Sequence, residues 1–469
     1  MRDLKVLSSL LVVAAVCSLA ALSPAQEKAG FTLPTYDKFV LDNGLTVYLM
    51  EHHEVPLVYV SVVFPAGAVY DGDKFGLANL TGEGLLFGTE NYSKEKIEET
   101  FDFYGAGIST GASLETASVN VSCAVKDVEI LFPILAEVIT KPVFDEQELT
   151  KRKMRLLAEL AQAKESPRRV IGSYFNRFVF GDHPYGNPVG GTPTTVSRLS
   201  AEDLKSFYNI HFRPEGSAIA VVGDFKAADM KARITGMLSG WKALGDAPGN
   251  PLEGAGLPEF DKPRLLLINK DDATETTFLI GGKGVKRGTP DYIPIMVINT
   301  ILGGRFTSWL NDELRVNAGL TYGARSSFAA YQHAGTFSMS SFTRNETTVE
   351  AIDLALKVYD RLLTEGVDQE TLDSAKAYVK GQYPPDFETA GQLAGLLTSM
   401  FVYGYDESFI NNFEETVDSI TVEKAREIIG NYFPRGNLQF VLVGKAADIK
   451  EAVSKYGDLS EKEIKAEGY

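Results

Sequence analysis

Cysteine is scarce in this chain of 469 residues, which contains only 2. Cys17 lies in an N-terminal apolar run, and Val16 stands where a lipid-attachment motif has a small residue, so we do not expect lipidation. Removal of that run would leave Cys123 alone, which excludes an intrachain disulfide. Cys123 alternates with Val121 and Val125 in a strand-like pattern. We therefore expect it to be a buried and unreactive thiol.

Positive charge is also in short supply. The chain has 46 Lys and Arg against 62 Asp and Glu, which gives a formal net charge of −16. A nucleic acid or an anionic membrane surface would be repelled by this excess of negative charge. The composition thus argues against both classes of partner, and it places no constraint on the fold.

Long apolar runs are absent after the N-terminal region. Arg2 and Lys5 precede an apolar stretch at residues 7–22, and the small residues at 23–25 form a cleavage pattern. These features predict a signal peptide at residues 1–25 and an exported protein, periplasmic in a source with two membranes. No later stretch reaches the roughly 20 apolar residues of a spanning helix, so we expect no membrane span.

The remaining chain is longer than a single hydrophobic core usually holds, so two or more domains are expected. A stretch rich in Pro and Gly at residues 244–258 is typical of a linker. The pattern of residues 199–223 recurs at residues 420–444. Each stretch begins with a helical segment, which is followed by a proline and then by an apolar strand. This repeat predicts two homologous domains, at residues 33–243 and 259–469.

Short apolar and β-branched runs predict strands in both halves. A hairpin is expected at residues 39–50, around the turn Asp42-Asn43-Gly44. Further strands are expected at residues 57–63, 117–125, 264–269 and 276–280, and long helices at residues 94–104, 146–164 and 350–363. Strands and helices without strict alternation favour an α+β fold, with helices packed on one face of a largely antiparallel sheet.

Residues 76–89, which read GLANLTGEGLLFGT, have the frame of a zinc-peptidase helix without its metal ligands. The inverted motif H-x-x-E-H places two zinc-binding histidines on one helix face, with a glutamate that handles the proton of the zinc-bound water. Asn79, Gly82 and Glu83 stand in these three positions. The surrounding frame resembles the insulinase/pitrilysin family of zinc metallopeptidases.

That resemblance implies a third ligand, a glutamate on a second helix, and Glu159 matches its position. Arg152 stands where the family has a supporting glutamate one heptad earlier. We therefore expect this chain to hold no zinc tightly and to have no catalytic residue of its own here. Two alternatives stay open: Glu159 is an ordinary solvated or ion-paired helix carboxylate, or Asn79, Glu83 and Glu159 form a weak site for a hard cation.

The second half carries the runs NTILGG at 299–304, LNDELR at 310–315 and GLTY at 319–322. They resemble the C-terminal signature of the same family, in which an Arg and a Tyr reach into the active site formed by the other half or subunit. Arg315 and Tyr322 match these two positions, and both side chains can donate hydrogen bonds to the oxyanion of a tetrahedral intermediate. The alternative is a surface charge at 315 and a half-buried strand residue at 322.

The resemblance covers the chain from about residue 33 to 446 and implies two homologous α/β sandwich domains in a clamshell arrangement. It further implies the inactive subunit of a heterodimeric zinc metallopeptidase, whose partner carries H-x-x-E-H and the zinc and acts with it on peptides. Two other hypotheses about function stay open: a stand-alone peptide-binding or assembly protein, and an active metallopeptidase with atypical ligands.

Overall fold

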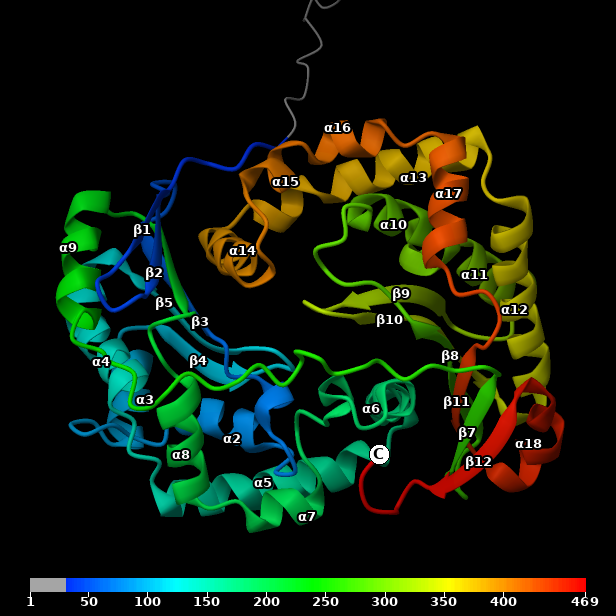
Figure 1. Cartoon of the computed structure of the whole chain (residues 1–469), viewed down its shortest axis with the longest axis horizontal. Helices are drawn as coiled ribbons and strands as arrows, with labels where there is room; N and C mark the ends of the chain where they lie inside the picture. Colours follow the sequence, from blue (N-terminus) through cyan, green and yellow to red (C-terminus); the bar gives the residue numbers. More distant parts are fainter. Residues whose placement is uncertain (1–30) are drawn as a thin grey trace, which may run out of the picture.

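The computed structural model describes residues 31–469, so the predicted signal peptide at residues 1–25 lies outside the described residues. Two six-stranded sheets lie on opposite sides of the molecule (Figure 1). The first sheet consists of β1 (Asp37–Val40), β2 (Thr46–Glu51), β3 (Leu57–Phe64), β4 (Gly107–Ala112), β5 (Ala117–Ala124) and β6 (Ala218–Gly223). The second consists of β7 (Arg264–Asn269), β8 (Glu275–Lys283), β9 (Ala324–Ala330), β10 (Gly335–Arg344), β11 (Gln439–Gly444) and β12 (Asp458–Glu463).

Both sheets share one topology. The order β2-β6-β3-β5-β4 in the first sheet corresponds strand by strand to β7-β11-β8-β10-β9 in the second. The sheets differ at one edge, where β1 runs antiparallel to β2 but β12 runs parallel to β7. Antiparallel pairs outnumber parallel pairs in each sheet. The predicted α+β fold with two largely antiparallel sheets is confirmed.

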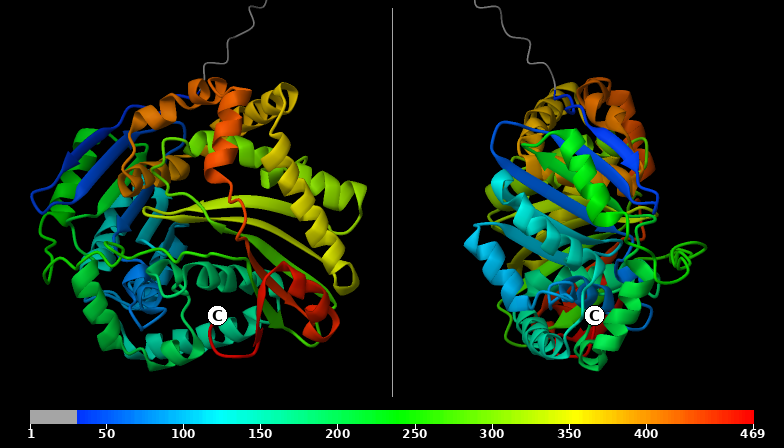
Figure 2. Two further views of the ribbon diagram at one scale, coloured as in Figure 1. Left: turned by 45° about the vertical axis from the view of Figure 1, so that its right-hand side comes forward. Right: turned by 90° about the vertical axis from the view of Figure 1, so that its left-hand side faces the viewer.

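Helices cover the outer face of each sheet (Figures 1 and 2). Over the first sheet and around its core lie α2 (Leu77–Gly84), α3 (Lys94–Phe103), α4 (Val128–Thr140), α5 (Glu146–Ala163), α8 (Ala201–His211) and α9 (Ala227–Leu238). Over the second lie α10 (Tyr292–Asn299), α12 (Thr348–Glu365), α13 (Gln369–Gln382), α16 (Phe413–Asp418), α17 (Val422–Tyr432) and α18 (Ala446–Val453).

The repeated sequence pattern produces the same local structure twice. Ser200 caps α8, because its hydroxyl accepts a hydrogen bond from the Asp203 N–H, and Thr421 caps α17 through the Lys424 N–H. The strands that follow, β6 and β11, are buried along their whole length. A strand buried on both faces requires a continuous apolar run rather than an alternating one, and both segments have it.

Two helices are exchanged between the halves. α6 (Pro167–Phe180), from the first half of the sequence, packs on the inner face of the second sheet against β8 and β11. α14 (Ala390–Tyr403), from the second half, packs on the inner face of the first sheet against β3 and β6. Both helices lie between the sheets in Figure 1. Each inner face is therefore covered by a helix of the other half, which interlocks the halves.

Three further sequence expectations concern single segments. Cys123 is buried in β5, and burial raises the pKa of its thiol to about 11, as expected for an unreactive cysteine. Residues 244–258 contain no regular helix or strand, but the predicted domain boundaries stay a prediction. Within residues 31–469, no helix has both the length and the apolar character needed to cross a membrane.

Candidate functional site

Residues 77–84 form α2, as the zinc-peptidase frame predicts. The helix begins after Gly76, which adopts a left-handed conformation with φ of 93°. The carboxylate of Asp71 fixes this end, because it accepts hydrogen bonds from the Gly76 and Ala78 N–H groups, each at 2.8 Å. Asn79 and Glu83 share one face, with the Asn79 amide 3.4 Å from the Glu83 carboxylate.

Arg152 of α5 fills the position between the two carboxylates of the degenerate site. Its guanidinium binds Glu83 in a bidentate manner, with Nε 2.6 Å from Oε2 and Nη2 2.9 Å from Oε1. Its Nη1 lies 3.2 Å from both carboxylate oxygens of Glu159. The hydrogen bond to Glu83 raises the pKa of Arg152, so the guanidinium stays charged. A fixed organic cation thus links α2 to α5.

The residues present do not fit a zinc ion. Glu83 and Glu159, which could ligate a metal, are both ion-paired with Arg152, and the remaining position of the motif holds the neutral amide of Asn79. The guanidinium also brings a positive charge to the place where a metal cation would bind. Across the described part of the chain, no cluster of three or more His, Cys, Asp and Glu residues has a metal-site arrangement.

Gly82 differs from the glutamate of the zinc motif in the space it needs as well as in its chemistry. A Cβ atom at this position would lie 2.8 Å from the carbonyl carbon of Gly111 and 2.9 Å from its oxygen. Gly111 belongs to β4, the edge strand of the first sheet, so α2 approaches this strand more closely than a side chain at 82 allows. The glutamate that H-x-x-E-H requires at this position would displace the helix or the strand.

Substitution of Gly82 by alanine is expected to destabilise the protein by about 1–3 kcal/mol, because the added methyl group meets backbone atoms. Gly172 in α6 is the matched control, since it is exposed in a helix interior and a Cβ built there has no neighbouring atom within 4 Å among the described residues. Gly172→Ala is expected to stabilise by up to about 1 kcal/mol. Chemical unfolding of both variants measures the difference, and equal effects would contradict the close packing of α2 on β4.

Arg315 and Tyr322 lie together at the second half's surface. Arg315 belongs to η6 (Asp312–Asn317), a π-helical segment, and Tyr322 lies in the loop that leads to β9. π-Helical turns are rare and occur frequently at functional sites. Tyr322 is 82% exposed. Both side chains line two cavities of about 500 and 600 Å³, so the structure brings the predicted pair together in space open to a ligand.

The pair is separate from the degenerate site of its own chain. Every residue that lines the two cavities lies between positions 275 and 378, and none belongs to α2 or α5. Among residues 31–469, Arg315 has no carboxylate partner, and its guanidinium lies over the ring of Phe306 at 4.6 Å. Arg315 and Tyr322 are thus available to groups outside the chain's own α2 site.

Two features of the site went unrecognised in the sequence. The ion pair of Arg152 with Glu159 could have been inferred, because these residues are seven apart and therefore share a helix face, whereas the pair with Glu83 depends on how α2 meets α5. Phe306 and Arg325 line the 600 Å³ cavity with Arg315. Phe306 lies two residues after the NTILGG run of the C-terminal signature, whereas Arg325 lies outside every motif.

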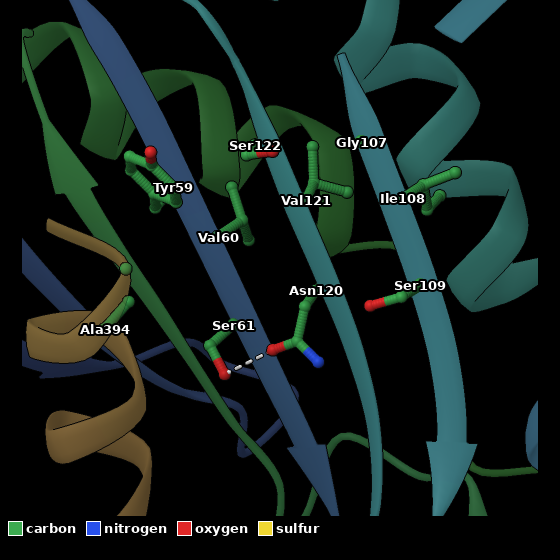
Figure 3. Close-up of a pocket in the computed structure, with 11 residues that line it drawn as sticks. Tyr59, Val60, Ser61, Gly107, Ile108, Ser109, Asn120, Val121, Ser122 and Ala394 are labelled. Atoms are coloured by element: carbon green, nitrogen blue, oxygen red, sulfur yellow. Dashed lines mark hydrogen bonds between the residues drawn. The ribbon is translucent and has the colours of Figure 1, made fainter. Parts of the chain in front are cut away.

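A third cavity lies on the inner face of the first sheet, beside α14 (Figure 3). It has a volume of about 380 Å³, and small polar side chains of β3, β4 and β5 lie among apolar ones in its lining. Ser61 donates a hydrogen bond to the Asn120 side chain at 3.0 Å, and Ser109 and Ser122 lie nearby on β4 and β5. The edge strand β4 borders this cavity, so its unpaired backbone groups are close to it.

Comparisons with known proteins identify the family. The family model for insulinase, peptidase family M16, matches residues 46–193, and the model for the peptidase M16 inactive domain matches residues 198–379. A protein of Bacillus subtilis described as uncharacterized zinc protease YmxG is 23% identical over 345 residues, which are 73% of this chain and 82% of the relative. A protein of Helicobacter pylori described as non-peptidase homolog YmxG is 23% identical over 399 residues, or 84% and 90%.

A solved structure agrees with the fold. The crystal structure of a peptidase M16 inactive domain from Pseudomonas fluorescens has a TM-score of 0.82 and 26% sequence identity, covering 88% of this chain and 98% of that chain. The predicted resemblance is confirmed, and the matches are consistent with a chain that has no peptidase activity of its own. The protein is therefore a member of the insulinase family, peptidase family M16, of the type that lacks the H-x-x-E-H residues.

Proposed function

We propose that this chain is the non-catalytic subunit of an exported, periplasmic zinc peptidase. It pairs with a relative that carries H-x-x-E-H, and it supplies Arg315 and Tyr322 to that partner's site. One observation carries this proposal: the two side chains are accessible at cavities that the chain's own α2 site does not share, while Arg152 occupies that site. The Arg and Tyr of the C-terminal signature are thus accessible, whereas the metal-ligand positions of the zinc motif hold other residues.

The chemistry of the pair suits peptide hydrolysis. In such a complex the H-x-x-E-H residues of the partner would hold the zinc, which would supply an activated water for attack on the peptide carbonyl. The Arg315 guanidinium and the Tyr322 hydroxyl are donors that can bind the carbonyl oxygen as it gains negative charge. The ring of Phe306 beneath Arg315 holds the guanidinium at the cavity wall without neutralising it. In the proposed complex this chain orients the substrate and stabilises charge, and it moves no proton at its own α2 site.

A stand-alone peptide-binding protein is the second candidate. The cavity between α14 and the strands β3, β4 and β5 favours it, because a largely apolar cavity with a few hydrogen-bonding side chains, beside an unpaired strand edge, suits an extended peptide without any partner subunit. This role would use the first sheet, whereas the accessory role uses Arg315 and Tyr322 in the second half. The two candidates therefore depend on different surfaces of the molecule.

Purification of the tagged chain from its native cells, followed by mass spectrometry, tests the accessory role. We expect an H-x-x-E-H relative to co-purify in roughly equal amount and the pair to hydrolyse peptides in a chelator-sensitive manner. Recovery of the chain alone, with no relative bound, would support the stand-alone candidate. Chelator-sensitive hydrolysis by the purified chain alone, abolished in Glu83→Ala or Glu159→Ala, would instead show an active enzyme with atypical ligands.

A further inference from the structure

The 600 Å³ cavity beside Tyr322 is strongly basic. Three arginines line it, Arg305, Arg315 and Arg325, and the described residues that line it include no aspartate or glutamate. The chain as a whole has 62 acidic and 46 basic residues, so a wall with three arginines and no carboxylate differs sharply from the average surface. The other residues of the wall are glycine, serine, asparagine, alanine and aromatic residues.

None of these three guanidinium groups has a carboxylate within 4.0 Å among residues 31–469. Other arginines do find such partners: Arg152 pairs with Glu83 and Arg233 with Glu129. The charge of the cavity is thus left uncompensated by the protein itself. A clustered set of unpaired arginines is a ready site for an anion, because a planar guanidinium binds a carboxylate through two parallel hydrogen bonds.

Two of the arginines are held in place by neutral groups. Arg305 donates from Nη1 to the carbonyl oxygen of Ser374 at 3.2 Å and to its hydroxyl at 3.1 Å, while its buried Nε has no hydrogen-bond partner within residues 31–469. Arg315 lies over the ring of Phe306. These contacts restrict each side chain and leave its charge in place, so little conformational entropy remains to be lost on binding.

Arg325 completes the wall from the sheet. It lies on β9, the edge strand of the second sheet, in register with Ser340 of β10. Ser327, two residues along β9, points to the same face, and both serines also line the cavity. The floor beneath the arginines therefore offers hydroxyl groups and no competing charge.

We propose that this cavity binds a carboxylate of a peptide, either an aspartate or glutamate side chain or the C-terminal carboxylate, and so selects acidic peptides. The proposal rests on the proposed function only in taking the ligand to be a peptide. The net charge of −16 opposes the approach of such a ligand from a distance. Salt screens that repulsion beyond about 8 Å at physiological ionic strength, whereas direct contacts within the cavity are screened much less.

Binding of four fluorescent peptides of equal length to the purified full chain, without any partner, tests the proposal. One peptide has an internal glutamate and an amidated C-terminus. The second has glutamine instead and a free C-terminus, the third has glutamine and an amidated C-terminus, and the fourth has lysine and an amidated C-terminus. We expect the first or the second to bind about tenfold more tightly than the third, and the lysine peptide to bind least. Which of the first two binds more tightly identifies the source of the carboxylate.

Arg325→Gln is the test variant, because Arg325 is exposed on an edge strand and its loss leaves no buried group unpaired. It is expected to weaken binding of the carboxylate peptide about tenfold, and Arg325→Lys is expected to recover part of that loss. Arg155→Gln is the matched control, since Arg155 is also exposed and has no ion pair in the described part of the chain, but lies on α5, away from the cavity. Thermal unfolding of each variant verifies that it is folded.

Equal binding of all four peptides, no binding of any, or an unchanged affinity in Arg325→Gln would overturn the carboxylate site. Each of these results can occur while the chain still co-purifies with an active H-x-x-E-H relative, in which case the accessory role stands. Conversely, the purified chain can show selective, Arg325-dependent binding while no H-x-x-E-H relative co-purifies from native cells; that combination would support the carboxylate site and reject the accessory role. The two proposals therefore fail separately.

Discussion

Replacement of Arg315 by alanine is expected to lower the turnover of the assembled peptidase on peptides by about 10²–10³-fold. The guanidinium is proposed to stabilise the oxyanion that forms when the peptide carbonyl is attacked, and removal of one such donor typically costs this much. Tyr322→Phe removes only the hydroxyl and is expected to act in the same direction. Because neither side chain holds a structural hydrogen bond or ion pair within residues 31–469, both variants are expected to fold normally.

The measurement is the steady-state turnover of the two-chain complex, with assembly checked by size-exclusion chromatography. Arg155→Ala is the control, because it removes from α5 an exposed arginine that has no ion pair with any described residue. A loss of turnover in a complex that still assembles separates a role in the reaction from a role in the interface. Unchanged turnover in both Arg315→Ala and Tyr322→Phe would reject the assignment of these two residues.

The second large effect concerns stability. Arg152→Ala is expected to destabilise the protein by about 2 kcal/mol, because it leaves Glu83 and Glu159 facing each other without a cation. The guanidinium side chain is 15% exposed and that of Glu83 23% exposed, so partial solvent access holds the loss below that of a fully buried pair. A fall of several degrees in the thermal midpoint is the expected observation.

Arg233→Ala provides a matched control, because Arg233 also binds a glutamate, Glu129, through both of its terminal nitrogens but on the surface. Little change in the thermal midpoint is expected there, since exposed ion pairs contribute little. Addition of Mg²⁺ or Ca²⁺ is expected to restore part of the lost stability in Arg152→Ala and none in the wild type, because only the variant has both carboxylates free. Equal thermal midpoints for Arg152→Ala and wild type would show that the guanidinium does not take the structural place of a metal cation.

Much of the architecture could be predicted from the sequence, since local patterns decide it. The hairpin of β1 and β2, the strand β7 and the helix α5 lie within one or two residues of their expected positions. The internal repeat predicted two related units, and both sheets have the same strand order. These features depend on periodicity, turn residues and helix caps, which are properties of neighbouring residues.

The exchange of α6 and α14 had no signal in the sequence. Both helices have apolar faces, but an apolar face says only that a helix is covered and not which sheet covers it. The close approach of Gly82 to Gly111 is of the same kind, because it depends on where β4 passes α2. Such contacts join residues far apart in the chain, and their geometry is set by the packing of whole elements.

In the candidate site, too, the sequence determined some features and the packing of distant elements determined others. The sequence by itself determined that the metal ligands are replaced, since Asn79, Gly82 and Glu83 stand in the motif, and that Arg315 and Tyr322 match the second signature. Only the tertiary structure decided that Arg152 ties Glu83 to Glu159, and that Arg325 joins Arg315 at one cavity. The physical reason is that a motif fixes which side chains are present, whereas the charge around each one depends on elements that meet only in the folded chain.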